Sequence, residues 1–332
     1  MNTKKHKVFI TRRIPETGLS LLRKACDVEV YNGEDGISYQ LLLEKLKDIE
    51  GIITLLSDKI DKNALSQAPK LRVVSNYAVG YDNIDVPYAT NRGILVTNTP
   101  GVLTDATADL SWALLMAVAR RIVEGDRLMR EKKFSGWSPL LLLGQDLKGK
   151  TLGILGAGRI GTAVAERSVG WKMIILYYDR NQNLYLEKTL SARRASFTEL
   201  IQQSDFISIH LPLTAETKHL INEQILQQMK KSAILINTAR GAVIDENALV
   251  KALENHWIAG AGLDVFENEP EVAPGLERLT NVVLAPHIGS ATIQARQEMA
   301  KMAAINLIDA LEGRLPKFTI NPEAFKGTSI NK

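Results

Sequence analysis

Residues 151–180 contain the first group of residues whose types and spacing indicate chemistry. The apolar run "TLGIL" is followed by Gly156, Gly158 and Gly161 in the spacing GxGxxG, then by a helical pattern and a second apolar run, "MIILYYD". Glycines so placed permit a tight turn, close approach of the backbone to a pyrophosphate and close packing of a helix whose free N–H groups bind anions. With Arg159 and Ile160, which open the helix, they predict a dinucleotide-binding site rather than an ordinary glycine-rich turn.

The second apolar run ends at Asp179, 18 residues after the last glycine. A carboxylate at this place accepts hydrogen bonds from the ribose hydroxyls of the adenosine and repels a 2'-phosphate, which favours NAD over NADP. Arg180 follows directly, and a guanidinium there can pair with that phosphate, although it is equally suited to a solvated surface. We therefore expect NADH to be preferred and NADPH to remain possible.

Three further polar residues follow apolar runs in the C-terminal half. Arg240 comes after "AILINT", Glu269 after "GAGLDVF" and His287 after "NVVLAP". Each has an ordinary structural explanation, as a surface ion pair, one acid among several in "ENEPE", or a histidine capping a strand. In a doubly wound sheet, however, the carboxyl ends of the strands line the ligand crevice, so all three are expected to face the nicotinamide.

Short apolar runs alternate with helical patterns along the whole chain, which predicts parallel sheets covered by helices on both faces. In the first half we expect helices at about 16–25, 38–47 and 61–67, and a long helix over "TDATADLSWALLMAVARRIVEGDRLMRE". The strands expected around these helices and in the second half are "KVFITR", "DVEVY", "GIITLL", "RVVSNY", "ILVTNT", "KTLGILGAG", "KMIILYYD", "ARRASF", "FISIHL", "AILINT", "GAGLDVF" and "NVVLAP".

This pattern predicts an α/β fold with two doubly wound, parallel-sheet (Rossmann-like) domains and an active-site cleft between them. A last helix at about 290–312 precedes the tail "GRLPKFTINPEAF", which has no core of its own and is expected to pack back onto the first unit. We therefore expect a discontinuous substrate (catalytic) domain formed by residues 1–99 plus 290–332, and an NAD-binding domain at 100–289.

Composition excludes several classes of protein. The 332 residues include 41 Lys and Arg and 37 Asp and Glu, and because these are interspersed, the net charge of +4 does not indicate nucleic-acid binding. No signal peptide or apolar run of about 20 residues is present, which predicts a cytoplasmic protein without a membrane segment. The single cysteine, Cys26, rules out an internal disulfide or a cysteine-rich metal site, and we expect it to be a buried filler.

These motifs, with the early run "NYAVGYDNID", resemble those of the D-isomer-specific 2-hydroxyacid dehydrogenase family. The resemblance covers nearly the whole chain, and "VTNTPGVLTDATAD" is most similar to the glyoxylate and hydroxypyruvate reductases of that family. It implies the interrupted two-domain fold, a homodimer, and a catalytic set that matches Arg240, Glu269 and His287.

The reaction implied is the reduction of a small 2-oxo acid, glyoxylate or hydroxypyruvate, to the 2-hydroxy acid by hydride transfer from NAD(P)H. The guanidinium of Arg240 can bind the substrate carboxylate and polarise the carbonyl through paired donors. Glu269 would orient the imidazolium of His287 and stabilise it, so that the ring carries a proton near neutral pH. His287 would then protonate the carbonyl oxygen in reduction and remove the hydroxyl proton in oxidation.

The resemblance also implies contacts outside the catalytic set. The loop "NYAVGYDN" would offer the N–H groups of Val79 and Gly80 to the substrate carboxylate, with a turn residue as the alternative role of Gly80, and Leu55 would wall the pocket. Trp137 matches an aromatic residue that reaches the partner's active site, although a place in the dimer core is an equal alternative. Asp264 would hold the nicotinamide carboxamide, and the further cofactor contacts expected are Thr107, Thr238 and Ala239.

Other functions stay open at this point. Co-repressors of the same fold act as NAD-sensing binding modules, and family members act on phosphoglycerate or bulkier 2-oxo acids. Formate dehydrogenases carry Gln where this chain has Glu269, and regulated phosphoglycerate dehydrogenases add a C-terminal domain for which residue 332 leaves no room. A zinc alcohol dehydrogenase is disfavoured because the chain offers no ligand cluster, so we expect no metal.

Overall fold

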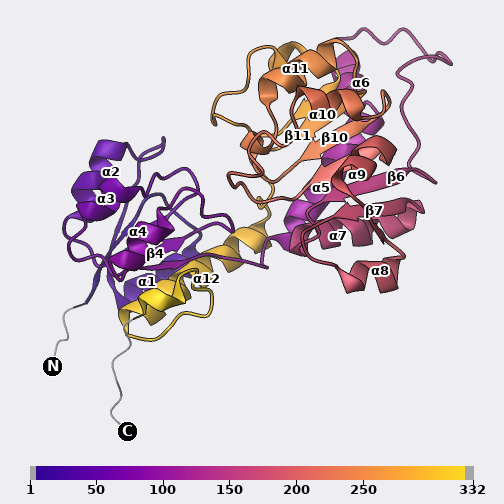
Figure 1. The fold of residues 1–332 in the computed structure, drawn as a ribbon. Helices are drawn as coiled ribbons and strands as arrows, with labels where there is room; N and C mark the ends of the chain where they lie inside the picture. Colours follow the sequence, from indigo (N-terminus) through magenta and orange to yellow (C-terminus); the bar gives the residue numbers. More distant parts are fainter. Residues whose placement is uncertain (1–4, 326–332) are drawn as a thin grey trace. The chain divides into compact units, whose positions relative to one another are not determined.

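The structure is a computed structural model that describes residues 5–325. It contains two compact units, one formed by residues 1–103 with 291–332 and the other by residues 104–290. Each unit is built on one parallel sheet, as Figure 1 shows. The doubly wound α/β class expected from the sequence is therefore confirmed.

The sheet of the first unit has the strand order β2-β1-β3-β4-β5. Helix α12 packs on α1, β3 and β4, while α2, α3 and α4 supply the core on the other face. The bounds are β1 (Lys7–Ile10), α1 (Glu16–Ala25), β2 (Asp27–Val30), α2 (Tyr39–Leu46), β3 (Gly51–Thr54), α3 (Lys62–Ser66), β4 (Val73–Asn76), α4 (Val86–Asn91), β5 (Leu95–Thr97) and α12 (Ile293–Leu311). The inner strands β3 and β4 are buried throughout, as parallel strands covered on both faces must be.

The tail after α12 packs on β5, as expected. Ile320 donates its N–H to the Val96 carbonyl, and Thr319 forms an antiparallel bridge with Thr97. The buried amide of Asn321 accepts from the Val96 N–H and donates to the Ile94 carbonyl, so one side chain satisfies both polar groups of this sheet edge.

The sheet of the second unit has the order β12-β11-β10-β9-β6-β7-β8. From β6, the chain adds β7 and β8 on one side of the sheet and β9 to β12 on the other, so the strand order reverses between β6 and β9. Ligands of doubly wound folds bind at such a switch point. The strands are β6 (Thr151–Leu155), β7 (Ile174–Tyr178), β8 (Arg193–Arg194), β9 (Phe206–Ile209), β10 (Ile234–Asn237), β11 (Gly260–Leu263) and β12 (Val282–Leu284).

Helices cover both faces of this second sheet. One core contains side chains of α5 (Thr104–Ala119), α7 (Arg159–Arg167) and α8 (Leu184–Leu190). The other contains side chains of α9 (Phe197–Gln203), α10 (Glu223–Gln228) and α11 (Glu246–Glu254). Short 3-10 turns, of which η2 (Gly241–Val243) matters below, connect some of these elements.

The single long helix expected over residues 104–131 is wrong, because the chain forms α5 and then a separate helix, α6 (Ile122–Arg130). The break lies at Arg121, whose φ of 52° is left-handed and interrupts the helical hydrogen bonds. The Arg121 guanidinium pairs with Glu124 in the first turn of α6, at 2.8 Å and 2.7 Å. No glycine or proline marks this break in the sequence.

Cys26 is buried, and burial raises the pKa of its thiol to about 11. The thiol is therefore protonated near neutral pH and behaves as a small apolar side chain, as expected. Among residues 5–325, no helix is long and apolar enough to cross a bilayer.

Candidate active site

The glycine-rich loop after β6 has the geometry that its spacing predicts. Gly156 has φ +95°, and a Cβ there would lie 2.7 Å from the carbonyl oxygen of His210, which follows β9. A Cβ on Gly161 would lie 2.0 Å from the Gly156 oxygen, so only glycine allows α7 to start so close to the strand. Gly158, in contrast, faces open space. The residues that open α7, Arg159 and Ile160, place their N–H groups at the helix N-terminus beside that space.

Asp179 directly follows β7 and holds this loop. Its Oδ2 accepts from the Ala157 N–H at 2.8 Å, and its Oδ1 accepts from the Asn181 N–H at 2.9 Å. Each carboxylate oxygen keeps a second lone pair, so these bonds leave capacity for a ribose hydroxyl. Arg180 is exposed, and its carbonyl, like that of Asp179, accepts from the Arg194 guanidinium at 2.8 Å.

Asn183 is a part of this loop that sequence reasoning missed. Its Nδ2 donates to the Ala157 carbonyl at 2.9 Å and to the Thr162 hydroxyl at 3.0 Å. The Ala157 peptide groups are thus held from both sides, by Asp179 at the N–H and by Asn183 at the carbonyl. The only sequence signal was the position of Asn183 as the N-cap of α8.

His287 and Glu269 come together beyond the ends of β12 and β11. Nδ1 of His287 lies 2.8 Å from Oε2 and 3.0 Å from Oε1 of Glu269. A carboxylate only accepts hydrogen bonds, so Nδ1 carries the proton and Nε2 is the ring nitrogen left for another partner. Both side chains are partly exposed, by 25% for His287 and 29% for Glu269, so a small molecule can reach them.

Glu269 is held in its charged form. Burial pushes the pKa of its carboxyl up, but the hydrogen bonds from His287 and from the Phe266 N–H, and the charges of His287 and Arg240, together hold that pKa below its usual value. The Phe266 N–H lies 3.0 Å from Oε1. Glu269 is therefore a carboxylate near neutral pH, which suits it to stabilise an imidazolium.

Asp264 holds the backbone of His287. The Asp264 carbonyl accepts from the His287 N–H at 2.9 Å, and its carboxylate accepts from the N–H groups of Ile288 and Gly289, both at 2.7 Å. His287 has φ 53°, a left-handed conformation that a non-glycine residue keeps only where its surroundings fix it. Burial raises the pKa of Asp264, partly offset by the Ile288 and Gly289 N–H groups. The sequence predicted a contact with the cofactor here and did not predict this anchoring of the histidine.

Arg240 follows β10, where Asn237 fixes its backbone. Asn237 donates to the Arg240 carbonyl at 2.9 Å and accepts from the Ala239 N–H at 3.0 Å, while Nη1 of Arg240 donates to the Ala239 carbonyl at 2.8 Å.

Helix α5 is bonded to the loops that follow the strands. The Thr238 hydroxyl, next to the Arg240 turn, lies 2.8 Å from the hydroxyl of Ser111 of α5. Ser111, which sequence reasoning missed, and Thr107, whose hydroxyl donates to the Gly289 carbonyl at 3.2 Å, thus tie α5 to two strand-end loops.

The loop at Val79 and Gly80, in the first unit, presents a row of N–H groups. The carbonyls of Ala78, Val79 and Gly80 are each bound by groups of the domain: the Thr99 N–H at 2.9 Å, Nδ2 of Asn98 at 2.7 Å and Nδ2 of Asn76 at 2.7 Å.

In a trans peptide the N–H points opposite to the carbonyl, so these bonds turn the N–H groups of residues 79, 80 and 81 to the other side. None of the three donates to an acceptor within residues 5–325. Successive N–H groups of this kind form a cavity for an anion.

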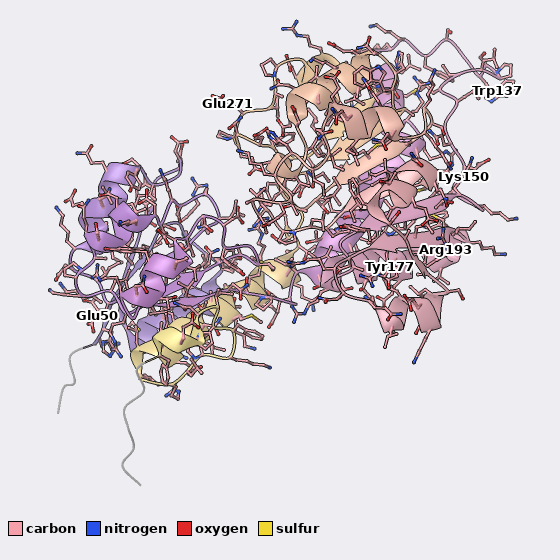
Figure 2. All side chains as sticks on the ribbon, in the orientation of Figure 1. Glu50, Trp137, Lys150, Tyr177, Arg193 and Glu271 are labelled. Atoms are coloured by element: carbon pink, nitrogen blue, oxygen red, sulfur yellow. The ribbon has the colours of Figure 1, made fainter. Side chains whose placement is uncertain are left out.

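Leu55 lies after β3 in the same unit and is half-buried. Its N–H donates to Oδ2 of Asp58 at 2.6 Å, and its carbonyl accepts from Asn83 at 3.0 Å. Trp137, by contrast, is 85% exposed and stands at the outer edge of the second unit, as Figure 2 shows. Trp137 therefore contacts none of the site groups of its own unit described above.

The family model for the D-isomer-specific 2-hydroxyacid dehydrogenase NAD-binding domain matches residues 112–289. The glyoxylate reductases of Thermococcus litoralis and Pyrococcus horikoshii are each 54% identical to this chain. These alignments cover 96% and 97% of the chain, respectively, and 98% of each relative. The chain belongs to the D-isomer-specific 2-hydroxyacid dehydrogenase family. The resemblance noted in the sequence is thereby confirmed.

Solved structures of similar sequence have the same fold as this chain. A protein of Thermus thermophilus aligns with a TM-score of 0.88 at 45% identity, over 95% of this chain and 99% of its own. The NADPH-dependent glyoxylate/hydroxypyruvate reductase of Sinorhizobium meliloti, in complex with NADP and malonate, aligns with a TM-score of 0.87 at 32% identity, over 98% and 100%. As a member of the family, this dehydrogenase uses NAD(P), and its glycine-rich loop fits that group.

Proposed function

We propose that this dehydrogenase reduces a small 2-oxo acid, glyoxylate or hydroxypyruvate, to the 2-hydroxy acid at the expense of NAD(P)H. The names of the relatives support the substrate, since glyoxylate reductases more than 50% identical align over nearly the entire chain. The observation that carries the chemistry is the pair of His287 and Glu269, 2.8 Å apart, at the strand ends of an NAD-binding domain.

Bound along the glycine-rich loop, NAD(P)H would supply the hydride for the carbonyl carbon and would be oxidised to NAD(P)⁺. His287 donates the proton of Nε2 to the carbonyl oxygen, which becomes the hydroxyl group. Glu269 holds the Nδ1–H and stabilises the imidazolium before that transfer. In the oxidation direction the same ring accepts the hydroxyl proton.

We propose one group of carboxylate-binding donors within each unit. The N–H groups of residues 79, 80 and 81 form an anion cavity in the substrate domain, residues 1–103 with 291–332, and Leu55 is proposed to wall the same pocket. The guanidinium of Arg240, in the NAD-binding domain, supplies paired donors of the geometry that a carboxylate accepts. With the carboxylate fixed, the carbonyl next to it lies at a set place for the hydride and the proton.

We further propose cofactor and assembly features. Asp179 favours NADH, and Arg180 gives residual use of NADPH; Thr107, Thr238, Ala239 and Asp264 are proposed to line the cofactor site. We also propose a cytoplasmic location and a homodimer, and the homodimer is supported by the apolar side chains that α6 and the segment after it expose. These are Ile122, Val123, Met129, Phe134, Trp137, Leu140, Leu141 and Leu143. Figure 1 shows that segment, between α6 and β6, standing clear of the helices of its unit.

Initial rates of NADH and NADPH oxidation with glyoxylate, hydroxypyruvate, pyruvate and a phenyl-substituted 2-oxo acid test the proposal. We expect fast turnover with the first two and NADH. Faster turnover with the phenyl acid would keep the reaction and contradict the small pocket. Tight NADH binding without turnover of any of the four would instead support an NAD-sensing binding module.

A further inference from the structure

The loop Phe266–Pro270, which carries Glu269, is packed directly against the turn that follows Arg240. A Cβ on Gly241 would lie 1.9 Å from the Phe266 carbonyl carbon and 2.3 Å from the Glu267 nitrogen. No side chain larger than hydrogen fits between the two backbones. The segments that carry Arg240 and Glu269 are therefore in contact through their main chains, and the position of one constrains the other.

A buried carboxylate of α11 holds the same loop. Glu246 is the first residue of α11 and is 4% exposed. Its Oε1 accepts from the Glu267 N–H at 2.6 Å, and the Ala273 N–H also faces this carboxylate. One of these N–H groups precedes Glu269 in the chain and the other follows it, so Glu246 faces the loop on both sides of the residue that contacts His287.

A second histidine–glutamate pair fixes the outer side of the loop. Nε2 of His219 lies 2.7 Å from Oε1 of Glu267, and the His219 N–H donates to the Ala242 carbonyl at 2.8 Å. Through its ring and its backbone, His219 thus joins Glu267 to η2, the turn after Arg240. The proposed reaction uses neither His219 nor Glu267.

The charges of this region make the burial of Glu246 costly. Burial raises the pKa of Glu246, and the nearby negative charges of Glu267 and Glu269 raise it further, while the Glu267 and Ala273 N–H groups lower it. The positive end of the α11 helix dipole favours an acid at this position. Of the charged groups facing these carboxylates, His219 pairs with Glu267, and His287 and Arg240 act on Glu269.

We infer that Glu246 is a positioning residue for the reaction: by binding the Glu267 N–H it holds the Glu269 carboxylate against the ring of His287. The expected change in kcat rests on the proposed function, whereas the expected change in the position of Glu269 rests on geometry alone. Glu246 touches neither His287 nor, on this assignment, substrate or cofactor.

Glu246→Gln tests the inference, because the amide keeps the size of the side chain and loses one acceptor oxygen. Asp205→Asn is the matched control. Asp205 is also buried and accepts a backbone N–H, that of Thr151 at 2.9 Å, but it lies at the amino end of β9, away from the loop. Both variants lose a charge-assisted bond to a backbone N–H. Asp205→Asn also loses the ion pair with Lys230, at 2.9 Å, so a general loss of stability should be at least as large in the control, and only an effect particular to the loop should change His287.

We expect Glu246→Gln to lower kcat about tenfold, the size typical of one lost charge-assisted hydrogen bond, with little change in KM for NADH. Reduction needs a protonated His287, so activity falls as pH rises. If the Glu269 carboxylate moves away from the ring in the variant, His287 holds its proton less well. The alkaline limb of kcat/KM then moves to lower pH by roughly half a unit or more. Asp205→Asn should leave the limb in place.

An NMR titration of the His287 ring gives the same answer without turnover. With five histidines in the chain, the resonance is assigned by its loss in a His287→Gln variant. We expect the midpoint of the His287 titration to fall in Glu246→Gln and to stay in Asp205→Asn. A fall in the midpoint in an enzyme that reduces no 2-oxo acid would support the positioning role while contradicting the proposed function.

An unchanged midpoint and unchanged kcat in Glu246→Gln would overturn the inference. Equal losses of kcat in Glu246→Gln and Asp205→Asn, with both midpoints unmoved, would also overturn it, because Glu246 would then be an ordinary stabilising residue. Should Glu246→Gln fail to fold, Glu246→Asp keeps the charge on a shorter side chain, and a shift of the midpoint in the same direction is expected of it.

Discussion

His287 and Glu269 stand on loops that follow two adjacent strands, β12 and β11, and meet with 2.8 Å between Nδ1 and Oε2. Parallel strands end at one edge of the sheet, so residues 18 positions apart in the chain become neighbours. The pairing fixes which ring nitrogen carries a proton toward the protein and leaves Nε2 for the substrate.

Removal of the His287 ring tests its role as the proton donor. His287→Ala should lower kcat at least about a hundredfold, as loss of a general acid does, while the enzyme still binds NADH. Steady-state rates with glyoxylate and fluorescence titration with NADH measure the two effects. His256→Ala is the control, because His256 lies at the end of α11, outside the proposed site. Near-wild-type kcat in His287→Ala would exclude the role.

The lowered pKa of Glu269 predicts how acid affects stability. A carboxyl whose pKa is lower in the folded state than in the unfolded state stabilises the fold at pH values above the unfolded pKa, near 4.5. This contribution is lost as the pH falls through the folded-state value. The free energy of unfolding of the wild type, measured with urea between pH 7 and pH 3, should therefore fall more than that of Glu269→Gln. Parallel curves for the two proteins would contradict the pKa shift.

The fold was predictable because its signals are local. Buried parallel strands form continuous apolar runs, and the glycines before α7 follow directly from the turn they must make. The break between α5 and α6 was not predictable, since Arg121 carries no residue-type signal for a left-handed φ. Trp137 was assigned by resemblance alone, and its own unit leaves it 85% exposed.

The supporting residues of the site were the hardest to predict. Asp264 could be assigned to the strand end but not to the N–H groups of residues 287–289, because that contact depends on how β11 and β12 pair. The buried side chains of Asn76 and Asn98, at the ends of β4 and β5, donate to the carbonyls of Gly80 and Val79. A weak signal existed, since an asparagine that directly follows a run of buried strand residues needs a polar partner.

Asn98 should control substrate binding through the peptide it orients. Asn98→Ala frees the Val79 carbonyl, so the Gly80 N–H loses its fixed direction, and we expect KM for glyoxylate to rise about tenfold with a smaller change in kcat. Asn321→Ala is the control, since Asn321 is equally buried in the same unit and binds only the β5 edge and Thr90. It should lower the melting temperature and leave KM unchanged. A similar rise of KM in both variants would mean that general loosening is the cause.

Asp179 and Arg180 should separate the two cofactors. Asp179→Ala removes the ribose acceptor and the bond to the Ala157 N–H, so KM for NADH should rise about tenfold or more. Arg180→Ala should raise KM for NADPH and leave that for NADH within about twofold, because a guanidinium matters only to the 2'-phosphate. Rates at varied concentrations of each cofactor decide this. An equal effect of Arg180→Ala on both cofactors would contradict the assignment.

Trp137 should be needed for self-association. Its ring and the side chain of Leu140, 77% exposed, are apolar groups on the surface of the same segment, residues 131–150, which a second copy of the chain would cover. Trp137→Asp places a charge on that surface, and size-exclusion chromatography with light scattering should show a shift from dimer to monomer. Leu184→Lys is the control, because Leu184 is also exposed, by 52%, but lies on α8. A monomeric wild-type protein would contradict the dimer. A Trp137→Asp variant that remains dimeric would show that the interface lies elsewhere.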